Sequence, residues 1–201
     1  MRKRAEMPVR MRRSYQSGFT LIETMIAILV MTIGVLGLAG MLADGLAFMS
    51  MSQMDYIAQQ KASEAVESIF TARDMGQATW DGICNVGSTI CSGGIFVNGA
   101  QPLCDPGTDG VIGTADDFAG TACAGGTQGT DAILQPNSAG VLNSTTATRV
   151  PLSAYQFQRT ITITSPASGL ANLRKIQVTI TYRAARFSRT YTMSTYISNF
   201  P

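Results

Sequence analysis

The sequence predicts an α+β protein: a long N-terminal α-helix, first transmembrane and then amphipathic, packed on a C-terminal antiparallel β-sheet. Residues 25–43 form an unbroken uncharged run, and residues 51–70 carry apolar side chains at helical spacing. Residues 155–198 alternate between apolar and polar side chains, which is typical of strands. We therefore expect five segments: a basic segment 1–18, a span 19–43, an amphipathic helix 44–75, a Cys- and Gly-rich loop region 76–150, and a sheet 151–201.

The composition excludes several classes of site. The 201 residues contain no histidine, so a Ser-His-Asp or Cys-His catalytic site and a His-ligated zinc are impossible. Serine and threonine are plentiful, but no catalytic constellation is visible, and we expect no enzyme. The charged fraction of 14% is low for a freely soluble chain, and the net charge of +2 argues against nucleic-acid binding.

A basic segment precedes the apolar run. Residues 1–18 hold six basic side chains and one acid, and Glu23 is the single charged residue of 19–43. The nineteen uncharged residues of 25–43 approach the thickness of a bilayer core, about 30 Å. Because positively charged segments stay on the cytoplasmic side of a membrane, residues 1–18 should be cytoplasmic. The chain after Ala43 should lie on the other side of the membrane. A secretory signal peptide and an ordinary signal anchor are the alternatives.

The residues before the run distinguish these alternatives. Residues 17–23 read Ser-Gly-Phe-Thr-Leu-Ile-Glu, which resembles the type IV pilin family, including minor pilins and type II secretion pseudopilins. The resemblance implies that prepilin peptidase removes residues 1–18 by cutting between Gly18 and Phe19. It also implies methylation of the new N-terminus at Phe19.

Glu23 stands out because an ionisable group in an apolar segment normally has a partner. One interpretation is a carboxylate that merely reaches the membrane interface. The resemblance implies that Glu23 neutralises the Phe19 amine of a neighbouring subunit when the helices bundle in a filament.

Three glycines mark the span. Gly34, Gly37 and Gly40 lie along one side of the helix, where small residues allow neighbouring helices to approach closely. Ordinary glycine enrichment of membrane helices is the alternative. Major pilins commonly have proline where this chain has Gly40, and residues 33–40 are most similar to PilV-type minor pilins.

The helix should continue beyond the membrane to about Asp74, because no proline occurs between Phe19 and Pro102. Its apolar stripe predicts an amphipathic helix packed on a domain. The stripe comprises Met51, Met54, Ala58, Ala62, Ala65, Val66, Ile69 and Phe70.

The four cysteines lie in the loop region without a C-x-x-C pair, which argues against zinc and for disulfides in an exported domain. Three connectivities are possible for two disulfides. We favour the nearest-neighbour pairing, Cys84 with Cys91 and Cys104 with Cys123.

An aspartate- and glycine-rich stretch follows Cys104. Counted from Asp105, residues 105–116 place carboxylates, glycine and a carbonyl oxygen at several positions of an EF-hand loop, although Gly107 leaves the third position without a side chain. We expect a structural calcium site; a solvated acidic turn is the alternative. Its ligands would be Asp105, Asp109, the Val111 carbonyl, Asp116 and Asp117.

Three strands are expected at 155–164, 175–183 and 189–198, and the helix stripe should cover their apolar face. After Asp131 the chain has seven basic residues and no acid, whereas residues 19–131 hold twelve acids. Pairing between subunits and neutralisation within one subunit both remain open. Scattered arginines without an aromatic platform argue against nucleic acid as a partner.

The combined prediction is a minor pilin that enters or primes a type IV pilus and supports pilus assembly, adhesion or twitching motility. Its partners would be prepilin peptidase, the bacterial inner membrane before assembly, and other pilins in a filament at the cell surface. The alternatives are a type II secretion pseudopilin, a membrane-anchored calcium-dependent adhesin or lectin that does not polymerise, and a secreted enzyme.

Overall fold

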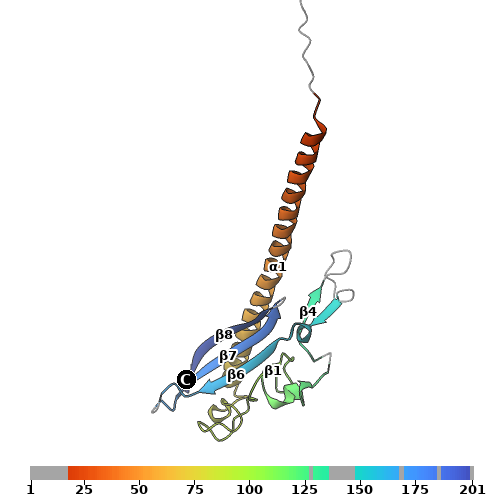
Figure 1. Ribbon diagram of the computed structural model, residues 1–201. Helices are drawn as coiled ribbons and strands as arrows, with labels where there is room; N and C mark the ends of the chain where they lie inside the picture. Colours follow the sequence, from red (N-terminus) through yellow and green to blue (C-terminus); the bar gives the residue numbers. More distant parts are fainter. Residues whose placement is uncertain (1–17, 127–128, 136–147, 168–169, 185–186, 200–201) are drawn as a thin grey trace, which may run out of the picture. The chain divides into compact units, whose positions relative to one another are not determined.

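The computed structural model describes residues 18–126, 129–135, 148–167, 170–184 and 187–199. The predicted leader lies outside the described residues except for Gly18. The chain divides into two compact units, Met1–Leu46 and Ala47–Pro201. A long helix, α1 (Leu21–Asp74), is followed by short loop elements and C-terminal antiparallel strands (Figure 1). The predicted α+β class is therefore confirmed.

The first unit consists of the N-terminal part of α1. Every described side chain from residue 18 to 46 is exposed, although most are apolar. The helix contains an apolar window of mean hydropathy 2.5, long enough to cross a membrane, and none of that window is buried. Residues 18–46, the described part of this unit, therefore have no core of their own.

In the second unit, the remainder of α1 presents a stripe of small side chains to the core. The buried residues recur every three or four positions, as expected for one helix face; they are Ala58, Ala62, Ala65, Ile69 and Ala72. Met51, Met54, Val66 and Phe70 are partly buried beside them. The predicted stripe is confirmed, and its alanines let the helix lie close to the sheet.

The main sheet has the strand order β1-β6-β7-β8, and all neighbouring strands are antiparallel. Figure 1 shows the last three strands side by side in blue. Their bounds are β1 (Gln101–Pro102), β6 (Gln158–Thr164), β7 (Leu173–Ala184) and β8 (Phe187–Ser198). Ile161 pairs with Val178, which pairs with Met193, so one face carries the apolar side chains that join the helix in the core.

Two details of the predicted sheet are wrong. The first strand starts at Gln158, because Leu152–Tyr155 form a 3-10 helix, η3, that ends at Gln156 in the left-handed region with a φ of 54°. The fourth strand, β1, comes from the loop region, where no alternating pattern announces a strand of two residues.

The loop region contains short elements. They are η1 (Trp80–Gly82), η2 (Ala115–Asp117), the hairpin β2 (Phe118–Ala119) with β3 (Ala122–Cys123), and β4 (Ala132–Gln135), which pairs with β5 (Thr148–Pro151). Residues 127–128 and 136–147 of this region lie outside the described residues.

Two disulfides link the four cysteines, Cys84 with Cys91 and Cys104 with Cys123. The nearest-neighbour pairing is confirmed. Cys84, Cys104 and Cys123 are buried, so the crosslinks lie within the packed part of the loop region.

Candidate functional site

The segment Gly18–Phe19–Thr20 precedes α1 and is exposed, and the Phe19 side chain is 81% exposed. Thr20 caps the helix: the Glu23 amide donates to Thr20 Oγ1 at 3.4 Å, and the Thr24 amide donates to the Thr20 carbonyl at 3.2 Å. The spacing Thr-x-x-Glu is that of a capping box, a sequence signal that could have located the start of this helix. The bond between Gly18 and Phe19 therefore lies just outside a capped helix.

The Glu23 carboxylate is exposed in the first turn of α1, where the helix dipole favours a negative charge. It makes no hydrogen bond or ion pair with any residue that the structure describes. Among the described residues, Glu23 therefore has only this local stabilisation.

The apolar surface of the first unit is continuous along the helix. Ile22, Leu29, Leu36 and similar side chains are more than half exposed. Around Gly34, Gly37 and Gly40, an added Cβ atom would meet nothing within 4 Å, so no contact inside the chain requires these glycines. Such a surface is stable only in a bilayer or against other helices.

Three of the predicted calcium ligands come together. One carboxylate oxygen from each of Asp109, Asp116 and Asp117 lies within 4.8 Å of the others. The two other predicted ligands make contacts of their own. Asp105 lies 3.5 Å from Arg149 Nη2, and the Val111 carbonyl accepts a hydrogen bond from Thr114 Oγ1 at 3.0 Å.

Asp116 occupies the space that a side chain at the third loop position would need. A Cβ atom on Gly107 would lie 2.3 Å from Asp116 Oδ2. This oxygen accepts hydrogen bonds from the Asp109 amide and the Thr108 hydroxyl, both at 3.1 Å. A hydrogen bond from the Thr114 hydroxyl is the main cause that lowers the pKa of Asp116 to about 2. Gly107 is therefore a requirement of the loop itself rather than a missing ligand.

Asp117 is the buried member of the cluster, at 1% exposure. Its two oxygens accept hydrogen bonds from the Gly107 and Gly113 amides, each at 2.6 Å. Burial raises the pKa of Asp117, while these bonds and the charge of Arg159 act in the opposite direction. The aspartates thus organise the loop through its backbone, whether or not they also coordinate a cation.

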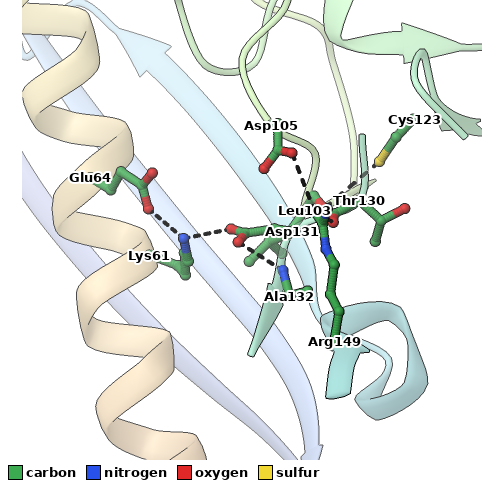
Figure 2. Close-up of polar contacts among 9 residues, drawn as sticks. All are labelled: Lys61, Glu64, Leu103, Asp105, Cys123, Thr130, Asp131, Ala132 and Arg149. Carbon is green, nitrogen blue, oxygen red and sulfur yellow. Dashed lines mark hydrogen bonds and ion pairs between the residues drawn. The ribbon is translucent and has the colours of Figure 1, made fainter. Parts of the chain in front are cut away.

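A polar network that the sequence did not predict joins the loop region to α1 (Figure 2). Lys61 Nζ lies 2.7 Å from Glu64 Oε2 and 2.6 Å from Asp131 Oδ2. In the same view, Arg149 Nη2 donates to the Thr130 carbonyl at 2.7 Å.

Charge pairing within one subunit accounts for part of the uneven charge distribution. Arg149 of β5 pairs with Asp105, and Arg189 of β8 lies 2.9 Å from Asp55 of α1. These contacts favour neutralisation within the subunit for these two arginines. The other open alternative, pairing between subunits, stays a prediction for the remaining basic residues.

A protein-family model described as the prokaryotic N-terminal methylation motif matches residues 13–39. No curated protein and no solved structure matches the chain. The matched segment includes the Gly18–Phe19 bond, Glu23 and most of the apolar run. It supports a type IV pilin-like or pseudopilin-type prepilin, a structural protein that prepilin peptidase processes and that associates with other pilins.

Proposed function

We propose that this chain is a minor type IV pilin of the PilV type, a subunit that enters or primes a pilus and so supports assembly, adhesion or twitching motility. The observation that carries the proposal is the methylation motif at residues 13–39, which includes the start of α1, a helix whose side chains are all exposed as far as residue 46. The absence of proline at Gly40 favours a minor rather than a major subunit.

Processing would occur on the cytoplasmic face of the inner membrane. Prepilin peptidase would cut between Gly18 and Phe19 and remove the basic segment, and the Phe19 amine would then be methylated. The exposed Phe19 and the capped start of α1 suit this step, because the bond to be cut is followed at once by the helix. The mature subunit would remain in the membrane as a single-pass protein with a periplasmic domain until assembly.

Assembly would exchange lipid for the helices of neighbouring subunits. In a bundle, the Glu23 carboxylate of one subunit would lie beside the Phe19 amine of another, and the cost of burying either charge alone would favour that pairing. Gly34, Gly37 and Gly40 would allow close contact between helices.

The test compares Glu23→Ala with Glu23→Gln. Glutamine keeps the capping-box spacing with Thr20 but removes the charge, so both variants should be cleaved normally and both should be depleted from sheared filaments. Mass spectrometry of the N-terminus measures cleavage and methylation, and immunoblotting of sheared filaments measures incorporation. Normal incorporation of both variants would show that the Glu23 charge is not needed for assembly.

The same fractions distinguish the alternatives. A pilin is expected in surface filaments, whereas a type II secretion pseudopilin would stay in the cell envelope and a membrane-anchored adhesin would stay uncleaved in the membrane fraction. Recovery only in the envelope after cleavage would favour the pseudopilin.

Calcium binding by the aspartate loop stays a prediction; of its predicted ligands, Asp109, Asp116 and Asp117 bring carboxylate oxygens within 4.8 Å of one another. If calcium binds, it should raise the thermal midpoint of the full chain in detergent, and Asp109→Ala should abolish that rise. Glu67→Gln, an exposed change on α1, is the control. If calcium does not raise the thermal midpoint of the wild-type chain, the loop is an acidic turn held by its own hydrogen bonds.

A further inference from the structure

An open pocket of about 430 Å³ lies in the second unit, beside η1 and the start of β7. Its walls come from Trp80 and Asp81 of η1, from Asn172 just before β7, from Arg174 in β7, and from Ile90. Ile90 belongs to the loop that the Cys84–Cys91 disulfide closes. The volume falls within the range of small-molecule sites, roughly 300 to 1,000 Å³.

The aromatic wall of this pocket is held in place. Trp80 is half-buried, and its indole Nε1 donates a hydrogen bond to the Ala171 carbonyl at 3.2 Å. The Arg174 guanidinium carbon lies 4.2 Å from the centre of the Trp80 ring, a cation–π contact. Arg174 Nη1 also donates to the carbonyls of Trp80 and Ile83. The ring is therefore positioned before any ligand arrives.

Several polar groups of the pocket are left without partners. The side chains of Asp81 and Asn172 are exposed and make no hydrogen bond with any described residue. Arg174 is buried, at 3% exposure, and uses Nη1 for both of its hydrogen bonds, so its Nε and Nη2 make none among the described residues. The pocket thus offers a carboxylate that accepts hydrogen bonds and an amide that both donates and accepts them, beside a largely buried guanidinium.

We propose that this pocket binds one ring of a neutral carbohydrate. Sugar hydroxyls donate and accept at adjacent positions, which matches a carboxylate beside a guanidinium and an amide. The C–H face of a sugar ring is apolar and suits the indole.

The two charged side chains of the pocket have opposite signs. Burial lowers the pKa of the Arg174 guanidinium, and the charge of the Asp81 carboxylate opposes this effect. The attraction that one side chain exerts on an ion is offset by the repulsion from the other. The pair therefore gives the pocket no net charge that would favour an ionic ligand over a neutral one.

This inference goes beyond the proposed role as a subunit, because binding a sugar does not require assembly. It would supply a partner for adhesion. Its test can fail while the assembly test succeeds, and the reverse also holds, since one uses the unassembled chain and the other uses filaments.

The experiment uses Trp80 as the reporter, because it is the single tryptophan of the chain. The purified full chain in detergent is titrated with glucose, galactose, mannose, N-acetylglucosamine and N-acetylgalactosamine into the millimolar range. A saturable change in tryptophan fluorescence with at least one of them is expected. N-acetylneuraminic acid serves as an anionic comparison.

Two pocket variants and two matched controls complete the test. Asp81→Asn removes the charge that strengthens a hydrogen bond, and Asn172→Ala removes a hydrogen bond to the ligand, so each should weaken binding about tenfold. Glu67→Gln on α1 and Gln177→Ala on β7 make the same chemical changes outside the pocket and should leave binding unchanged. Circular dichroism checks that all four variants fold.

The proposal is overturned if no neutral sugar changes the fluorescence, if N-acetylneuraminic acid alone does so, or if the pocket variants bind as tightly as the wild-type chain.

Discussion

Lys61 of α1 forms an ion pair with Asp131, which directly precedes β4, with 2.6 Å between Nζ and Oδ2. Both side chains are largely buried, at 17% and 15% exposure, and Lys61 also reaches Glu64 on the next helical turn. The Asp131 carboxylate in addition accepts a hydrogen bond from the Ala132 amide at 3.0 Å. This ion pair connects the start of β4 to the part of α1 that packs in the core.

Replacing Lys61 by methionine should lower the free energy of unfolding by about 1 to 3 kcal/mol, because Asp131 would remain buried without its cation. Glu64→Gln should cost less than about 1 kcal/mol, since the Glu64 side chain is 44% exposed. Urea unfolding of the full chain in detergent measures both. Lys61→Met combined with Asp131→Asn should cost less than the sum of the single changes; full additivity would contradict the coupling.

Alkaline pH should weaken the contact between α1 and the sheet through Tyr182. Burial, and next its hydrogen bond to Asp55, raise the pKa of Tyr182 from 10.0 to about 12. The folded state therefore holds the proton more tightly than the unfolded state, so this contribution is present below pH 10 and is lost as pH rises toward about 12.

The Tyr182→Phe variant tests this loss. Phenylalanine keeps the ring that stacks on Phe157, with 4.9 Å between ring centres, but has no proton to lose. Its stability should fall less between pH 10 and 12 than that of the wild-type chain. Burial lowers the pKa of Lys61, but its hydrogen bonds and charge attraction to Asp131 and Glu64 outweigh this effect and raise the pKa above 10.5. The stabilisation that Lys61 contributes is therefore also lost in alkali. Tyr196→Phe, at an exposed position, should match the wild type; equal pH profiles for all three chains would contradict the role of Tyr182.

Acid should destabilise the aspartate loop through Asp116. Its pKa is lowered from 3.8 to about 2, so the stabilisation is present above pH 3.8 and is lost as pH falls toward about 2. Asp117 has a raised pKa and acts in the opposite direction above pH 3.8, outside this window. Asp116→Asn should flatten the loss of stability in this window, measured as the thermal midpoint. If the thermal midpoint of Asp116→Asn falls as steeply with decreasing pH as that of Glu67→Gln, Asp116 does not make this contribution.

The two disulfides should stabilise the chain unequally. Cys104 and Cys123 are 19 residues apart, whereas Cys84 and Cys91 are 7 apart, so the first crosslink restricts the unfolded chain more. On the loop-entropy account, removing them would cost about 3 and about 2.5 kcal/mol respectively. Unfolding of the two double-alanine variants, compared under the same conditions, measures the order. A larger loss for the shorter loop would indicate that packing around Cys84 outweighs chain entropy.

The helical part of the fold was predictable because its signals are local. The uncharged run of 25–43, the apolar stripe from Met51 to Phe70 and the absence of proline together indicate one helix, and α1 ends at Asp74 as expected. The alternation of residues 175–183 and 189–198 likewise indicates strands that β7 and β8 contain. The predicted start of β6 was wrong because Gln156 takes a left-handed conformation, which no typical turn residue indicates in the sequence.

The sequence predicted the two candidate sites to different degrees. The motif around Gly18 and Glu23 is contiguous, so the sequence alone indicated it, and the family model covers the same residues. The spacing of the aspartates did not determine the geometry of their loop, because spacing counts residues but does not show where a carboxylate points. Asp105 lies beside Arg149, and Asp116 fills the space above Gly107.

The sequence by itself determined the basic segment, the apolar helix, the methylation motif and the alternating strands, because each depends on residues close together in the chain. The tertiary structure decided that Lys61 meets Asp131, that β1 joins the sheet, and that Trp80, Asp81 and Arg174 surround one pocket. These relationships join residues far apart in the chain, and they form only when the helix and sheet bury their apolar faces together.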